Sequence, residues 1–209
     1  MNQLVSKSVV TDEIVDIYET LGLENPDISI LSDKFLEDVQ ALPQKNVAVA
    51  LLDRLLKGKV RSLMRTNATQ SKKFSEMLDN AINQYNKRSI DSSKVIEELI
   101  ELAKSIDKAQ KEGEALGLNA DEIAFYDALA SHDTAKQVLG DEKLKAIAYE
   151  LTKTVKENMS IDWHKRKNAQ ARMRVAVRRL LKKYGYPPDI QKLAVENIVE
   201  QAELMASNI

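Results

Sequence analysis

Apolar residues recur at three- and four-residue spacing along most of the chain, which is the pattern of amphipathic α-helices. No proline lies between Pro43 and Pro187, and glycines are few in that stretch. Two short segments, 5–10 and 27–31, lack the turns that hairpin strands need. The pattern predicts an all-α, multi-helix bundle of about eight to ten helices, over residues 11–21, 32–42, 46–67, 71–85, 92–116, 121–130, 141–158, 162–184 and 188–206.

The best internal boundary is the segment Gly113–Ala120, because it carries two glycines between polar helices. The helices then divide into two groups on either side of it. We therefore expect one bundle or two helical lobes, an N-terminal lobe over 1–117 and a C-terminal lobe over 118–209.

The predicted helix 162–184 has two unlike faces. One is an apolar stripe with the i, i+3, i+4, i+7 spacing of a core-facing helix. Cations occupy the opposite arc, so that packing the stripe inward leaves them in solvent. The stripe consists of Met173, Ala176, Val177, Leu180, Leu181 and Tyr184, and the outward cations are Arg172, Arg178, Arg179, Lys182 and Lys183.

An elbow follows this helix. Gly185 is predicted to have a positive φ, as glycines that end helices do, and the two prolines after it prevent continuation. The predicted structural elbow is Tyr184, Gly185, Tyr186, Pro187, Pro188 and Asp189. A last helix runs from about Pro188 to Ala206, and its spacing predicts that Leu193, Ala194, Ile198, Ala202 and Met205 point inward.

Charge is unevenly distributed along the 209 residues. Residues 162–184 hold nine Lys and Arg against one acid, so the segment carries +8, which leaves −9 for the rest of a chain whose formal net charge is −1. This distribution suggests an acidic helical body with one basic helix. The chain has no cysteine, no membrane-length apolar run and no signal-peptide pattern, and we therefore expect a cytoplasmic protein.

The sequence contains no complete catalytic, metal-binding or cofactor-binding motif. Gly58-Lys59 lacks the glycines of a phosphate loop and suggests a helix interruption. The two histidines, His132 and His164, lack the spacing of a helical zinc site. Asp141-Glu142-Lys143 is the sole Asp/Glu-x-Lys match to a nuclease motif, but it opens a helix, where Asp141 fits an N-cap. We expect no catalysis and no cofactor from these residues.

The basic helix is then the candidate functional feature. Its exposed cations suit phosphates or an acidic protein surface equally well. A solvated face balanced by the acidic remainder of the chain is the third interpretation. Composition leaves the three open.

Several segments together resemble a known family. They are Glu122–Leu129 (EIAFYDAL), Val138–Glu142 (VLGDE), Ile161–Trp163 (IDW) and Arg178–Asp189 (RRLLKKYGYPPD). This set resembles the C-terminal helical region of the restriction (R, motor) subunit of type I restriction-modification enzymes, over about residues 121–206. Lys167 departs from the pattern, because family members often carry an acid there.

The resemblance implies a non-catalytic assembly domain. R subunits of that family are far longer and carry a nuclease domain and two ATPase domains that translocate DNA; none of those motifs occurs here. The implied role is to dock the motor subunit onto the methyltransferase and specificity subunits. The alternative is a DNA-contacting module that uses the basic helix to hold duplex DNA near the motor.

Overall fold

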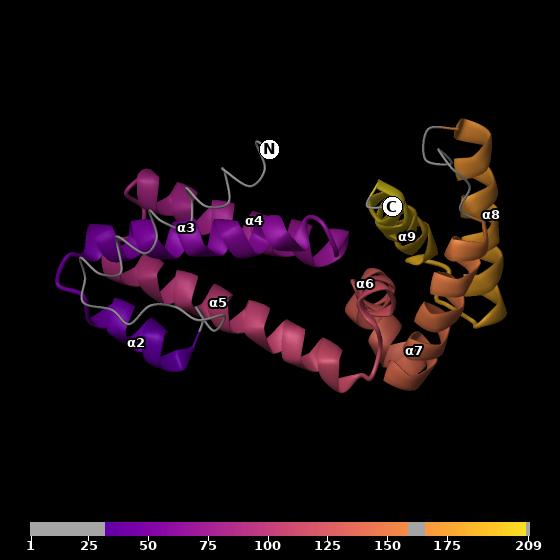
Figure 1. The fold of residues 1–209 in the computed structure, drawn as a ribbon, viewed down its shortest axis with the longest axis horizontal. Coiled ribbons are helices and arrows are strands. Elements are labelled where there is room, and N and C mark those ends of the chain that lie inside the picture. Colours follow the sequence, from indigo (N-terminus) through magenta and orange to yellow (C-terminus); the bar gives the residue numbers. More distant parts are fainter. Residues whose placement is uncertain (1–31, 159–165, 208–209) are drawn as a thin grey trace, which may run out of the picture.

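The computed structural model describes residues 32–158 and 166–207, and these form eight α-helices and no strand. The all-α prediction is confirmed for this part of the chain. The helices are α2 (Asp33–Ala41), α3 (Lys45–Leu63), α4 (Ala68–Asn86), α5 (Ser92–Ala115), α6 (Ala120–Leu129), α7 (Asp133–Asn158), α8 (Lys167–Lys183) and α9 (Gln191–Ser207) (Figure 1). The segments 5–10, 11–21, 27–31 and 161–163 lie outside the described residues.

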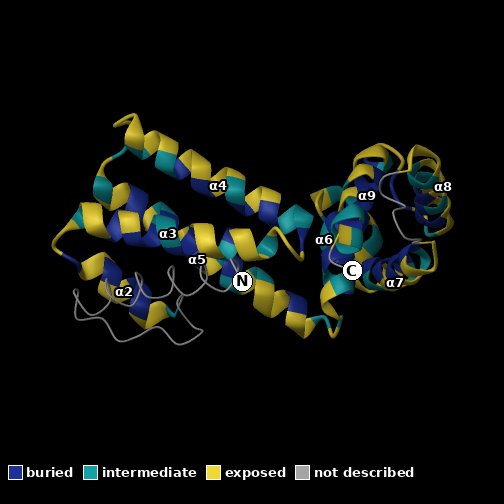
Figure 2. Ribbon diagram, turned by 45° about the horizontal axis from the view of Figure 1, so that its top comes forward, coloured by how far each residue is buried: buried dark blue, intermediate teal, exposed yellow. Residues whose placement is uncertain are grey.

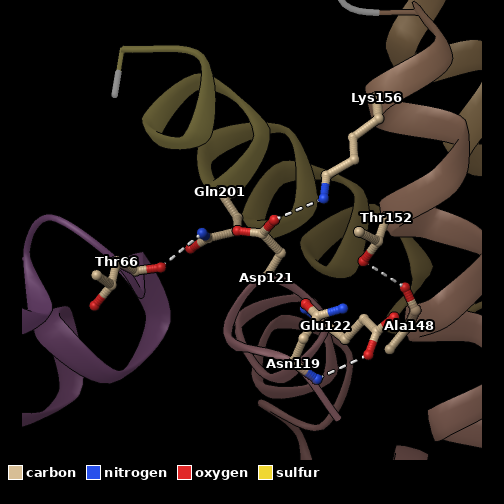
Figure 3. Close-up of polar contacts among 8 residues, drawn as sticks. All are labelled: Thr66, Asn119, Asp121, Glu122, Ala148, Thr152, Lys156 and Gln201. Atoms are coloured by element: carbon tan, nitrogen blue, oxygen red, sulfur yellow. Dashed lines mark hydrogen bonds and ion pairs between the residues drawn. The ribbon is translucent and has the colours of Figure 1, made fainter. Parts of the chain in front are cut away.

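Side-chain caps fix where four helices begin. Each cap accepts a hydrogen bond from the backbone N–H three residues further on, which satisfies one of the free donors of a first turn. The caps are Ser32, Asn67, Asp91 and Asn119. At Asn119 the bond is reciprocated, because the Glu122 carboxylate accepts from the Asn119 N–H at 2.9 Å (Figure 3).

The cap at Asn67 corrects the predicted boundary between the third and fourth helices. We expected one helix over 46–67 and the next from residue 71, but α3 ends at Leu63 and α4 begins at Ala68. The Asn67 N–H still bonds to the Leu63 carbonyl at 2.8 Å. Its side chain bonds forward to Gln70 at 3.0 Å, and this bond starts the new helix. α3 also runs through Gly58, which is therefore no interruption.

The break inside α7 lies at a predicted helix start and separates it from a helical segment that was not predicted. We expected a helix over 141–158 capped by Asp141; Gly140, with φ of 72°, interrupts α7 directly before Asp141, and the additional segment begins at Asp133. The Asp141 carboxylate instead accepts from the Tyr126 hydroxyl at 2.6 Å. This bond ties the α7 break to α6.

Two separate hydrophobic clusters make up the core. The first gathers residues of α2 to α5, from Phe35 to Ile106, and the second gathers residues of α6 to α9, from Phe125 to Ala202. Figure 1 shows the two groups of helices side by side, with α5 leading from one toward the other. Buried residues lie on the facing sides of the helices in each group (Figure 2). That the groups fold as separate units with a boundary at 117/118 stays a prediction.

Polar contacts join the two groups at the turn between α3 and α4. The carboxylate of Asp127 on α6 accepts from the side-chain amides of Asn67 at 2.6 Å and Gln70 at 2.7 Å, both on one oxygen. Gln201 on α9 is buried; its amide accepts from Ala68 N–H at 2.8 Å and donates to the Thr66 carbonyl at 2.9 Å (Figure 3). We call these bonds the polar joint.

Candidate partner-binding surface

Helix α8 packs one face inward and exposes the other, as the spacing predicted. Met173, Val177 and Leu181 are buried in the second cluster, against α7 and α9. The predicted outward cations, Arg172, Arg178, Arg179, Lys182 and Lys183, are all exposed. α8 begins at Lys167, with Arg166 as its N-cap, which corrects the predicted helix over 162–184; residue 162 itself lies outside the described part of the chain. We refer to the exposed side as the α8 face.

One of the five cations is held within the molecule. Lys183 pairs with Glu150 of α7 at 3.2 Å, and its Nζ lies 5.1 Å from the centre of the Tyr184 ring. Hydrogen bonds from the Tyr184 hydroxyl and from Lys183 lower the pKa of the Glu150 carboxyl. The bond between Tyr184 and Glu150 also raises the pKa of the Tyr184 hydroxyl. The position of Lys183 is therefore explained by contacts between helices.

The other four cations have no carboxylate partner among the residues that the structure describes: Arg172, Arg178, Arg179 and Lys182. Val175 lies in the middle of this face with 46% of its surface exposed, and Ala171 is exposed one turn away. A small apolar centre bordered by arginines is typical of protein–protein interfaces. Phosphate contacts need no such centre.

The elbow after α8 is held by specific backbone hydrogen bonds. Gly185 has φ of 70°, which confirms the predicted positive value. The Tyr186 N–H bonds to the Leu181 carbonyl at 2.9 Å and the Gly185 N–H to Lys182 at 3.1 Å, the pair of bonds of a Schellman helix end. Tyr184 closes the helix as its C-cap, Pro187 is buried, and Pro188 and Asp189 are exposed.

Tyr186 anchors this elbow to α6. Its ring is buried, and its hydroxyl donates to the Leu129 carbonyl, at the end of α6, at 2.7 Å. Burial raises the pKa of this hydroxyl to about 12, so it keeps its proton across the physiological range. The elbow thus sets where α9 begins. α9 starts at Gln191, three residues later than expected, and Leu193 is exposed, which corrects its predicted inward position.

The described residues offer no metal site, because no group of three His, Asp or Glu side chains lies close enough to hold an ion. His132 is exposed, beside the start of α7, and His164 lies outside the described residues. Among the described helices, none is both long enough and apolar enough to cross a membrane.

Sequence reasoning overlooked a second basic region. Residues 54–75 hold seven Lys and Arg and no acid at all, on the second half of α3 and the start of α4. The signal was a run of 22 residues without Asp or Glu. The remainder of the chain still carries −9, but it contains this second basic region.

The fold and its surfaces define a helical domain that presents two cationic helix faces. The chain belongs to the family described as the C-terminal region of type I restriction enzyme HindI endonuclease subunit-like proteins, which matches residues 1–208. The resemblance to type I restriction enzyme R subunits is confirmed.

Two relatives place this region within larger proteins. The chain is 35% identical, over all of its 209 residues, to a type I restriction enzyme HindI endonuclease subunit of Haemophilus influenzae. It is 37% identical over 187 residues, 88% of its length, to a provisionally named type I restriction enzyme MjaIXP endonuclease subunit of Methanocaldococcus jannaschii. The chain spans only 20% and 18% of these relatives. No solved structure matches it significantly.

Proposed function

We propose that this chain is a non-catalytic assembly domain, which docks a type I restriction motor and endonuclease subunit onto the methyltransferase and specificity subunits of the same system. The α8 face is the docking surface, and Arg172, Arg178, Arg179 and Lys182 are its contacting side chains. The single observation that carries the proposal is the pairing of exposed arginines with exposed Val175 on one face. Arginine and an apolar centre together suit an acidic protein surface.

A second role is supported by the same four cations. They could neutralise phosphates, so that the α8 face holds duplex DNA near the motor. In that case the logarithm of DNA affinity would fall against the logarithm of salt concentration with a slope of roughly −3.6 for about four phosphates.

Charge reversal of Arg178, Arg179 and Lys182 separates the two roles. We expect the triple variant to lose most of its binding to the purified methyltransferase–specificity complex, measured by biolayer interferometry, while its circular dichroism spectrum is unchanged. Lys104, Lys108 and Lys111 on α5 are exposed and supply a matched control with the same change of net charge. That control should bind like the wild type.

The outcomes are distinct. Unchanged binding of the triple variant to the complex would refute the docking role. A flattened salt dependence of DNA binding, with intact assembly, would favour the DNA role of the α8 face. Normal assembly and normal DNA binding together would make the α8 face a solvated surface.

A further inference from the structure

The second basic region forms a continuous face on α3. Arg54, Lys57 and Arg61 follow one another at intervals of three and four residues, which places them on one side of α3. Arg65 follows in the turn after the helix. Lys57, Arg61 and Arg65 are exposed and Arg54 is half-buried. At about 1.5 Å per residue, the three helical cations span about 10 Å. We call this the α3 face.

Packing explains why these cations point outward. The opposite side of α3 buries Leu52, Leu55, Leu56 and Val60 in the first hydrophobic cluster, against α4 and α5. Lys57 makes an exposed pair with Asp53 one turn earlier at 2.7 Å. Such a pair contributes little to stability and can exchange partners. Residues 54–75 themselves contain no acid.

The middle of the α3 face has no side chain. Gly58 is exposed within the helix, and a Cβ at that position would meet no atom within 4 Å. Glycine costs a helix roughly 1 kcal/mol relative to alanine, and no neighbour in the described structure requires it. A bare position between cations permits close approach of another molecule's backbone.

The α3 face has defined edges. On one side, Lys59 and Ser62 border a groove of about 430 Å³ that extends to α5 and α6. On the other side, Met64 and Lys72 border a hollow between α4 and α9, which is also lined by the acids Glu76, Glu200 and Glu203. These carboxylates limit the surface available to an anion to α3 itself and the first turns of α4.

We propose that the α3 face binds the phosphate backbone of duplex DNA. Duplex DNA carries about one negative charge per 1.7 Å of axis, so a row of cations along α3 and the turn that follows it can neutralise several phosphates. The α3 face differs from the α8 face in having an open glycine, Gly58, between its cations, and its exposed apolar side chain, Met64, lies at its border, after the end of α3. The relatives named as restriction endonuclease subunits make DNA the polyanion to test. The proposal goes beyond the docking role of the α8 face.

The test measures salt dependence with the 209-residue chain and a fluorescent duplex of about 30 base pairs. If the α3 face contacts about four phosphates, it contributes roughly −3.6 to the log–log slope of affinity against salt. Reversal of Lys57 and Arg61 should weaken binding at low salt at least about tenfold and flatten the slope by about 1.8, roughly 1 per lost contact.

The control reverses Lys108 and Lys111 on α5. Lys111 pairs with Asp107 one turn earlier at 2.7 Å, as Lys57 does with Asp53, and the change of net charge is the same. This control should keep the wild-type slope. The neutral variant Lys57→Gln with Arg61→Gln repeats the test if the reversed protein fails to fold, and should flatten the slope by a similar amount.

Three results would overturn the proposal: the wild-type chain does not bind the duplex, the α3 variant binds it normally, or the α5 control loses as much affinity as the α3 variant. If the α3 variant binds DNA normally and also fails to bind the methyltransferase–specificity complex, the α3 face serves a protein. Failure of the α8 docking role leaves the α3 measurement unaffected, because the two sets of variants share no residue.

Discussion

The helices α3 and α8 are both amphipathic and basic, but their surroundings differ. α8 has exposed Val175 between its cations, whereas α3 has Gly58 at the corresponding place on its exposed side. α8 ends in an elbow anchored to α6 by the Tyr186 hydroxyl. α3 ends in the turn that forms the polar joint with α6 and α9.

The difference shows that net charge alone does not assign a partner to a helix. What lies between the cations decides whether the face offers apolar area, as a protein partner requires, or a bare backbone that a phosphate chain can approach closely. The contacts at the end of each helix determine which neighbouring helices a mutation there would displace. The end of α8 positions α9 within one hydrophobic cluster, and the end of α3 connects the two clusters.

The largest expected effect is at the end of α8. Gly185→Val places a β-branched residue at φ of 70° and should lower the free energy of unfolding by about 2 kcal/mol, because L-residues are strained there. Urea unfolding followed by circular dichroism measures this loss. The matched control is Gly58→Val in α3, an exposed helical position with open space, where no loss is expected. Equal stability of the Gly185 variant and the wild type would show that the elbow tolerates strain.

The elbow was predictable from the sequence, and the polar joint was not. Gly185 between a long apolar stripe and two prolines has few other conformations available, so its positive φ followed from local rules. Asn67 and Gln201 act through partners 60 and 135 residues away, on Asp127 and Thr66 respectively. Helical periodicity contains no information about such pairs. The exposure of Leu193 depends equally on how the elbow rotates α9.

The α8 cations were located correctly because one apolar stripe determines the opposite arc. The α3 cations were missed because only the segment with the largest net charge, 162–184, was considered as a basic surface. Three of the four α3 cations and all five of those on α8 are exposed. Their binding partners are not encoded in the periodicity, and the proposals above rest on what surrounds each cation.

The next effect concerns the joint at the end of α3. Asp127→Ala removes the acceptor of two amides, those of Asn67 and Gln70, and should cost about 1.5 kcal/mol. Asp127→Asn should cost much less, because both amides bond to a single oxygen that an asparagine carbonyl can replace. Urea unfolding of both variants tests this order. Equal losses would mean that the joint needs the charge rather than the hydrogen bonds.

The joint also predicts a pH dependence. Burial raises the pKa of the Asp127 carboxyl above its ordinary value, and this outweighs the opposing hydrogen bonds from Asn67 and Gln70 and the charges of Lys136 and Lys73. The folded protein therefore binds this proton more tightly than the unfolded chain does, so the contribution of Asp127 to stability falls as the pH rises through the raised folded pKa. Asp127→Asn should remove that part of the pH dependence, as stability curves between acidic and neutral pH would show.

The smallest expected effect is a gain of stability in α3. Gly58→Ala should raise the free energy of unfolding by up to about 1 kcal/mol, because alanine loses less backbone freedom in a helix and meets no neighbouring atom here. A melting temperature about 2–4 °C higher is the expected signal for a chain of this length. A decrease would mean that Gly58 has a packing role inside the folded chain.

Longer side chains at Gly58 then separate stability from binding. Gln is nearly as good a helix former as Ala, so Gly58→Gln should also stabilise the chain. Its uncharged side chain would nevertheless project between Lys57 and Arg61, where the α3 face is proposed to approach the phosphate backbone. We expect Gly58→Gln to weaken duplex binding about threefold, while Gly58→Ala changes it little. If both variants bind DNA like the wild type, the open glycine has no part in binding, and the case for the α3 face rests on its cations alone.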